Sequence, residues 1–178
     1  MSQTDTLPPS GLKQLWLKWR FHLNILLILV PLGFMPKYFA DASLFRGDSG
    51  LGANIIQDVQ VGRWTLDLAE LRDEAPRAEG PAGYFKAFNA ACGNCNDGAK
   101  AIYLRVGKPR SLRAAGTIFF GAPARMGTSL PIPPRTRPDA DIWITIEGWD
   151  GKMYQASVPL AKASPATAAW LEKQGGNK

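Results

Sequence analysis

The sequence predicts a mainly β protein: an N-terminal transmembrane helix, then a small immunoglobulin-like antiparallel β-sandwich, then a short C-terminal helix. Three observations predict this fold class. One long apolar segment lies near the start of the 178-residue chain, several later runs alternate apolar and polar residues, and Gly and Pro occur 18 and 14 times. Apolar residues make up 46% and charged residues 20%. Such a composition excludes intrinsic disorder as the main state.

The apolar segment carries no charge between Arg20 and Lys37. A membrane-spanning helix needs about 20 apolar residues. We therefore predict a transmembrane helix over residues 21–39, with aromatic side chains at its N-terminal edge. Basic residues precede this helix, so residues 1–20 are expected to form a cytoplasmic leader. These basic residues are Lys13, Lys18 and Arg20.

Two interpretations of this segment stay open. The helix is either a retained anchor or part of a signal peptide cleaved after Ala42, because Ala40-Asp41-Ala42 has the small-x-small form of a cleavage site. Either interpretation exports the residues that follow. We expect a single-pass protein of a bacterial inner membrane, with a cytoplasmic N-terminus and a periplasmic C-terminal domain.

Glycine-rich sequence follows the helix and predicts a linker over residues 40–58. The expected β domain covers residues 59–162. Its strands are predicted where apolar and polar residues alternate between Gly, Pro and Asp. The predicted runs are Gln60–Leu71, Ala101–Val106, Thr117–Phe120, Asp141–Trp149 and Met153–Leu160.

Turn and cap residues complete the domain. Asp150-Gly151 lies between the last two predicted strands, which is a strong signal for a hairpin. Residues 163–178 are expected to form the C-terminal helix and tail. Ser164 is suited to the N-cap, Pro165 to the first turn, and Gly175 to the end of that helix.

The chain contains a single histidine, His22, which excludes Ser-His-Asp hydrolases and His-rich metal enzymes. Cys92 and Cys95 are the only cysteines. A Cys-x-x-Cys pair in an exported domain can form a small-loop disulfide, bind a metal or exchange disulfides. Haem attachment requires His after the second cysteine, and Asn96 stands there.

Metal binding by the cysteine pair would require further ligands. Zinc needs four ligands, and the sequence offers no second cysteine pair. Cu(I) could bind two thiolates together with Met126 or Met153. We predict a structural disulfide and keep thiol-redox chemistry and metal binding as alternatives. We assign no metal site and expect no cofactor.

Charge is strongly segregated along the chain. No Asp or Glu lies between Asp97 and Asp139, and the net charge of the whole chain is +6. A basic face beside a bilayer can contact anionic headgroups, an acidic partner or an anionic ligand. Arginine in particular makes paired contacts with carboxylate and phosphate groups. The residues predicted to form this anionic-partner surface are Lys100, Arg105, Lys108, Arg110, Arg113 and Arg125.

Several segments resemble uncharacterised proteobacterial single-pass inner-membrane proteins with a small periplasmic β domain, of the iron-uptake or respiratory accessory type. The resemblance rests on the leading helix, on residues 45–52, on Leu104-Arg105-Val106-Gly107-Lys108-Pro109-Arg110, and on Glu147-Gly148-Trp149-Asp150-Gly151. It implies no catalytic residue.

The function expected from these features is a membrane-anchored periplasmic binding or assembly module. It would support a larger inner-membrane complex, in metal (iron) uptake or respiration. The alternative is a periplasmic thiol-redox or metal-handling protein acting through Cys92 and Cys95. The expected partners are the lipid bilayer and an inner-membrane protein, and no nucleic acid. A thiol–disulfide activity is the only enzymatic alternative.

Overall fold

A computed structural model describes residues 11–46 and 50–175 of the chain. The chain divides into two compact units, Met1–Ala42 and Ser43–Lys178, each of which is considered by itself. Parts of three predicted segments lie outside the described residues. They are the first ten residues of the leader, residues 47–49 of the linker, and residues 176–178 of the tail.

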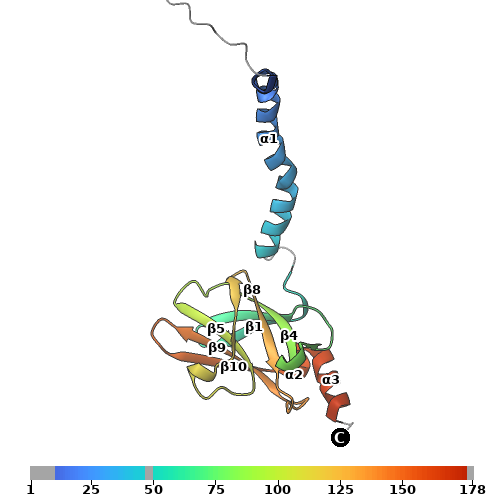
Figure 1. Ribbon diagram of the computed structural model, residues 1–178. Helices are drawn as coiled ribbons and strands as arrows, with labels where there is room; N and C mark the ends of the chain where they lie inside the picture. Colours follow the sequence, from blue (N-terminus) through green and yellow to red (C-terminus); the bar gives the residue numbers. More distant parts are fainter. Residues whose placement is uncertain (1–10, 47–49, 176–178) are drawn as a thin grey trace, which may run out of the picture. The chain divides into compact units, whose positions relative to one another are not determined.

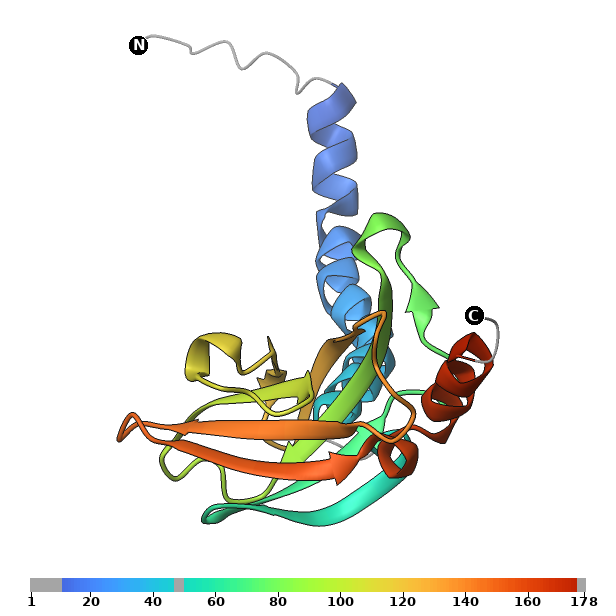
Figure 2. The same ribbon diagram turned by 90° about the horizontal axis from the view of Figure 1, so that it is seen from below.

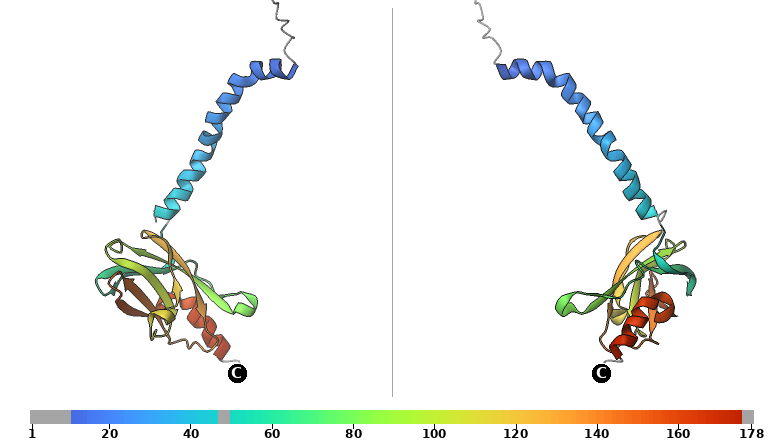
Figure 3. Two further views of the ribbon diagram at one scale, coloured as in Figure 1. Left: turned by 60° about the vertical axis from the view of Figure 1, so that its left-hand side comes forward. Right: turned by 90° about the vertical axis from the view of Figure 1, so that its right-hand side faces the viewer.

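In its described residues, 11–42, the first unit is helical throughout and belongs to α1 (Gly11–Arg46), whose last residues fall in the second unit. Figure 3 shows α1, coloured from blue to cyan, as one helix that bends near its N-terminal end. Its side chains from Gly11 to Asp41 are all exposed, although most of them are apolar. The segment Gly11–Ser43 is long and apolar enough to cross a membrane. The helix therefore contains the predicted span, 21–39, and extends beyond it at both ends.

Residues 50–175 of the second unit contain ten strands in two antiparallel sheets, which we call sheet A and sheet B. Figure 1 shows these sheets, with several of their strands labelled. Sheet A has the order β1-β2-β4-β8-β7, with β3 paired to β4, and sheet B has the order β10-β9-β5-β6. The strands of sheet A are β1 (Ala53–Val61), β2 (Trp64–Glu70), β3 (Arg77–Ala78), β4 (Tyr84–Cys92), β7 (Phe120–Ala122) and β8 (Arg125–Ile132). The strands of sheet B are β5 (Ala99–Val106), β6 (Thr117–Ile118), β9 (Asp141–Gly148) and β10 (Met153–Pro159).

Alternating apolar residues of both sheets form one buried core. Sheet A contributes Trp64, Leu66 and Leu68 from β2, each at most 1% exposed. Sheet B contributes the isoleucines of β9 and the apolar residues of β5 that face them. Period-two alternation places every second side chain on the same face of a strand, so these residues fall on the inner face together. The predicted mainly-β fold is confirmed.

The β9–β10 hairpin confirms the expected turn. The two strands pair without a register shift, and Figure 2 shows them as two long orange ribbons. At the turn, Asp150 Oδ1 accepts a hydrogen bond from the Lys152 amide at 3.0 Å, and Gly151 has a φ of 76°. This positive φ is one that glycine adopts without the steric cost of a Cβ.

The predicted linker, residues 40–58, is wrong at both ends. Helix α1 continues to Arg46, and β1 begins at Ala53. This strand lacks clear alternation because its register with β2 shifts twice, near Asn54 and Asp58, which have φ values of 46° and 57°. β1 is also the edge strand of sheet A, and bulges of this kind discourage pairing with other chains.

Two further strands, β4 and β8, fall where no strand was predicted. β4 carries the buried polar residues Lys86 and Asn89, and β8 contains Gly127 and Pro131. Neither strand therefore shows a simple apolar–polar pattern. Together they form the centre of sheet A, paired over seven residues from Tyr84↔Ile132 to Ala90↔Met126.

The C-terminal helix is confirmed and is preceded by a second, shorter one. α2 (Leu160–Ala163) begins within the segment predicted as the last strand, and α3 (Pro165–Gly175) follows it. Two 3₁₀ turns, η1 (Gly80–Ala82) and η2 (Leu112–Ala114), complete the unit. Trp170 of α3 contacts Tyr84 of β4, with ring centroids 4.6 Å apart. This contact holds α3 beside the sandwich.

Candidate functional site

Most of the arginines between Asp97 and Asp139, although not Arg125, lie near the end of β5. The loop from Gly107 to Gly116 leaves β5 and returns to it, because β6 pairs with β5 again at Leu104↔Thr117. Arg105 Nη1 donates a hydrogen bond to the carbonyl oxygen of Ala114 at 2.6 Å, which holds the loop against the strand. Gly116 has a φ of 113°, and a Cβ there would lie 2.1 Å from the Leu104 carbonyl oxygen. The return of the loop therefore requires glycine at this position.

Two adjoining hollows lie at this end of the sandwich. The first has a volume of 280 Å³, with Arg105 and Arg113 among its lining residues. The second has a volume of 460 Å³, with Arg135 and Arg137 among its lining residues. Both hollows share Val106 and Pro133. We call this pair of hollows and their four arginines the arginine end.

Most of the positive charge at the arginine end is unpaired. Arg113 and Arg135 are exposed and have no ion-pair partner among residues 11–46 and 50–175. Arg137 pairs with Asp139 at 2.5 Å, and both side chains are largely exposed. Among the residues that the structure describes, Asp139 is the only carboxylate that lines either hollow. The arginine end is therefore an exposed, concave surface with excess positive charge.

Two more predicted residues lie in the loop beside the arginine end. Lys108 Nζ lies 5.1 Å from the ring centroid of Trp143, which is a cation–π distance. Arg110 is exposed. Arg105, Lys108, Arg110 and Arg113 thus come from one strand end and one loop, as their closeness in sequence suggests.

The structure places the other two predicted residues elsewhere. Lys100 is the second residue of β5, at the opposite end of this strand, and lines a hollow together with Cys95. Arg125 begins β8 and pairs with Ala122 in the β7–β8 turn, next to Pro123, whose carbonyl oxygen accepts a hydrogen bond from the Cys92 amide. Both residues therefore lie toward the end of the sandwich that carries the cysteines. The sequence predicted that these six basic residues form one surface, but the fold places four of them near the arginine end and two near the cysteines.

Lys100 is also used within the fold. Its Nζ lies 2.7 Å from Glu147 Oε1, and the Tyr103 hydroxyl donates a hydrogen bond to Glu147 Oε2 at 3.2 Å. The hydrogen bond from Lys100 holds the pKa of Glu147 below its ordinary value, and the same bond raises the pKa of Lys100. Burial is the main reason that the pKa of Tyr103 is raised.

Cys92 and Cys95 form a disulfide, with their Cα atoms 5.4 Å apart. Cys92 is the last residue of β4, and both cysteines are buried, at 2% and 6% exposure. The Asn94 side chain fixes the turn between them, because it accepts a hydrogen bond from the Thr65 amide and donates one to the Arg63 carbonyl oxygen. The Cys92–Cys95 disulfide therefore cross-links a turn at the end of β4.

The surroundings of the disulfide bear on its chemistry. Cys92 borders an open hollow of 590 Å³ that also contacts Asp58 and Asp67. Met126 lines a different hollow together with Cys95, whereas Met153 lies on β10. Redox-active pairs typically lie at a helix N-terminus, which lowers the thiol pKa. In this structure the pair follows a strand, and its sulfurs are buried.

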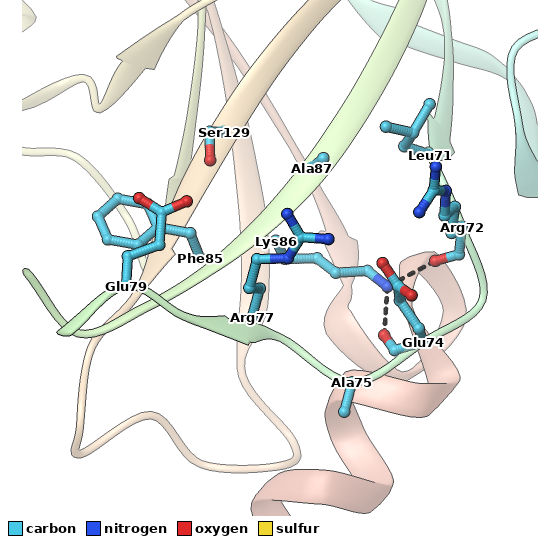
Figure 4. A pocket seen from close by; sticks show the side chains of 10 residues that line it. All are labelled: Leu71, Arg72, Glu74, Ala75, Arg77, Glu79, Phe85, Lys86, Ala87 and Ser129. Carbon is cyan, nitrogen blue, oxygen red and sulfur yellow. Dashed lines mark hydrogen bonds between the residues drawn. The ribbon is translucent and has the colours of Figure 1, made fainter.

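A second group of charged residues is buried, and sequence reasoning missed it. Lys86 Nζ lies 2.8 Å from Glu70 Oε2, and their side chains are 3% and 0% exposed. Lys86 also donates hydrogen bonds to the carbonyl oxygens of Arg72 and Glu74 (Figure 4). All three donors of the ammonium group are therefore satisfied.

Glu70 joins this group to distant parts of the chain. Its carboxylate accepts hydrogen bonds from the Asn54 side-chain amide and, at 2.5 Å, from Ser164 Oγ. Ser164 Oγ also lies 2.7 Å from Thr167 Oγ1. We call Asn54, Glu70, Lys86 and Ser164 the Glu70 cluster. It connects β1, β2, β4 and the start of α3, which gives it a structural role.

No metal centre is evident in this arrangement. Among residues 11–46 and 50–175, no group of three or more His, Cys, Asp or Glu side chains is placed to hold a metal ion. Beside the Glu70 cluster lies a hollow of 200 Å³, which is lined by both acidic and basic side chains (Figure 4). The two hollows of the arginine end together are lined by four arginines and one carboxylate, whereas the hollow beside Cys92 is lined by two aspartates and no basic residue.

Comparison with protein families places this architecture in a known group. The model of the family described as "Uncharacterised conserved protein UCP029505" matches residues 15–161. The chain belongs to this family. The UCP029505 match covers nearly all of α1 and the whole sandwich, so the apolar helix and the β domain both belong to the family's common sequence. No curated protein matches the chain. No solved structure matches it either.

Proposed function

We propose that the protein is a membrane-anchored binding or assembly module that uses the arginine end to hold a partner in a larger inner-membrane complex. In this proposal α1 is a retained anchor and the sandwich lies in the periplasm. The partner is an inner-membrane protein, and metal (iron) uptake or respiration is the process that the resemblance of the sequence suggests. The chain acts by binding and positioning.

One observation carries this proposal: arginines from the end of β5, from the loop that follows it and from the loop after β8 border two hollows that share Val106 and Pro133. Placing unpaired like charges together does not stabilise the folded domain, because the charges repel one another. An outside partner with negative charge removes that cost. Arginine is also the side chain best suited to paired contacts with carboxylates.

Two features support the proposed location. Basic residues lie before the apolar part of α1, and lysine and arginine are enriched on the cytoplasmic side of membrane helices. The disulfide between Cys92 and Cys95 suits an oxidising compartment such as the periplasm. The family match, which begins at residue 15, supports an anchor that is part of the functional protein.

The test is the size of the protein's complex after gentle extraction from its native membranes. A tagged full-length chain, solubilised in a mild non-ionic detergent, is expected to elute with a membrane protein in a complex well above its own 19.4 kDa. Cross-linking before extraction should retain the same companion. A chain that elutes alone in both experiments, at its normal expression level, would contradict the proposal.

The thiol-redox or metal-handling alternative has one observation in its favour. The disulfide borders an open hollow that exposes Asn94 and Asn96, so a peptide could approach it. Against it, the sulfurs themselves are buried, and the first thiolate would have to be formed at the end of a strand. Binding through the arginine end is therefore the function that the geometry supports best.

A further inference from the structure

The smaller hollow of the arginine end combines charge with an apolar floor. Leu104 and Leu130 line it and are both 0% exposed, so they form its bottom. Pro131 and Pro133 line it and are exposed, so they form part of its rim. Arg105 and Arg113 supply its charge, and none of its lining residues is acidic or aromatic. We call this hollow the Arg105–Arg113 recess.

Arg105 is held in place before any ligand arrives. It is half-buried, and one of its five N–H donors is used by the Ala114 carbonyl oxygen at 2.6 Å. The remaining donors are free to bind an anion, and little side-chain entropy is lost when they do so. Arg113 lies one residue before Ala114, in η2, and its side chain is exposed. The recess therefore offers one fixed and one movable guanidinium.

This combination identifies the chemistry of the ligand. A carboxylate accepts paired hydrogen bonds from guanidinium groups, and an adjacent apolar side chain gains free energy by covering buried leucines. A volume of 280 Å³ accommodates one or two side chains and is too small for a folded domain. A short protein segment in which acidic and apolar residues alternate satisfies all three conditions.

We propose that the Arg105–Arg113 recess binds an acidic, apolar-rich segment of the partner protein. One carboxylate of the segment lies between Arg105 and Arg113, and a neighbouring apolar side chain lies on Leu104 and Leu130. The segment continues past Val106 and Pro133 into the second hollow, where Arg135 receives a further carboxylate. This inference rests on the proposed function and names the chemistry of its partner.

A protein segment fits better than a lipid headgroup. Surfaces that dock on a bilayer typically add aromatic side chains at the interface. Neither hollow of the arginine end is lined by an aromatic residue. Among the described residues of the sandwich, the exposed aromatic side chains are Tyr84 on β4, Phe120 on β7 and Trp149 in the β9–β10 turn, and none of them lines either hollow.

The test is binding of a defined peptide to the full chain in dodecyl maltoside micelles. The probe is a fluorescein-labelled octapeptide in which Glu and Leu alternate, and its control has Gln in place of Glu. Fluorescence anisotropy measures the Kd. We expect the Glu peptide to bind and the Gln peptide to bind about tenfold more weakly or worse, because its amides cannot form charge-assisted hydrogen bonds.

Two double variants that lose the same charge distinguish binding in the Arg105–Arg113 recess from non-specific electrostatic attraction. Arg105→Gln with Arg113→Gln is expected to raise the Kd of the Glu peptide about tenfold or more. Lys162→Gln with Lys173→Gln removes the same charge from α2 and α3 and should change the Kd less than about twofold. Arg113→Gln alone alters an exposed side chain and keeps the test valid if the double variant does not fold.

Three results would overturn the proposal: no binding of the Glu peptide, equal losses in the two double variants, or equal binding of the Gln peptide. Short-chain phosphatidylglycerol that displaces the peptide at a lower concentration than unlabelled Glu peptide would also overturn it, in favour of a lipid site. Failure here leaves the proposed function standing if the native complex persists. Conversely, peptide binding without a native complex would refute only the proposed function.

Discussion

The Glu70 cluster and the arginine end both concentrate charged residues, and they use them in opposite ways. In the Glu70 cluster, Lys86 and Glu70 are at most 3% exposed, and each is bonded to several partners inside the domain. At the arginine end, Arg113 and Arg135 are exposed and border hollows. Buried charge must be paired within the fold, whereas exposed and concave charge remains available to another molecule. The contrast separates residues that hold the structure from residues that we propose carry function.

The largest effect is expected from breaking the buried ion pair. Lys86→Met leaves the Glu70 carboxylate buried without its cation, which should lower the free energy of unfolding by about 3–5 kcal/mol. Urea unfolding of the full chain in micelles, followed by tryptophan fluorescence, measures this loss. Adding Glu70→Gln should recover part of it, because the second change removes the uncompensated charge. A double variant less stable than Lys86→Met would contradict this account of the cluster.

Ser164→Ala tests the connection between the Glu70 cluster and the C-terminal helices. A hydrogen bond to a buried carboxylate is lost, so the free energy of unfolding should fall by about 1.5–3 kcal/mol. Ser157→Ala is the matched control, since Ser157 is exposed on β10 and should change stability by no more than about 0.5 kcal/mol. Equal effects of the two substitutions would show that Ser164 does not fasten the helices.

The Cys92–Cys95 disulfide is expected to stabilise the fold, as the Glu70 cluster does, and to take no part in binding. Cys92→Ala with Cys95→Ala opens a very small loop, and the chain-entropy relation gives a loss of about 2 kcal/mol. Peptide binding at the arginine end should stay unchanged, because the cysteines lie toward the other end of the sandwich. Loss of the native complex, or a changed redox state of its other members, with stability preserved would favour the thiol-redox alternative.

The smallest effect is expected from the ion pair between Lys100 and Glu147. The lowered pKa of Glu147 implies stabilisation that is present above its ordinary pKa and is lost as the pH falls through the lowered value. The raised pKa of Lys100 implies stabilisation that is lost only as the pH rises through that raised value. Because the Lys100 side chain is 46% exposed, the change should be slight.

Acid titration of stability, with and without Glu147→Gln, measures the contribution of this pair. The wild-type chain should lose slightly more stability than the variant as the pH falls through the acidic range. Identical pH dependence of the two chains would show that the pair contributes nothing to folding, which would place Lys100 among the residues available to a partner.

The sequence predicted the strands and turns that are marked by a local pattern of apolar, polar and turn-forming residues. Ile142, Ile144 and Ile146 recur at every second position, and Asp150-Gly151 follows the strand, so β9, its turn and β10 were predictable. β4 was not, because Lys86 and Asn89 are buried by partners far away in sequence. A buried lysine is indistinguishable from an exposed one until its acceptors are placed around it.

The candidate site was predictable only in part, for a similar reason. The absence of carboxylates between Asp97 and Asp139 indicated a positively charged surface but not its location. The strands determine the location, since Lys100 and Arg105 lie at opposite ends of β5. The turn from β8 added Arg135 and Arg137, which lie about 30 positions from Arg105 in sequence. Residue spacing alone could not join these segments.

Site-specific photocross-linking in native membranes tests the central claim most directly. A photoreactive amino acid is placed at Ser111, which is exposed in the loop of the arginine end, or at Asn96, which is exposed beside the disulfide. We predict that the chain labelled at Ser111 becomes linked to one membrane protein, and that Arg105→Gln with Arg113→Gln abolishes this product. A product formed only from Asn96, or one from Ser111 that persists in the arginine variant, would contradict the account.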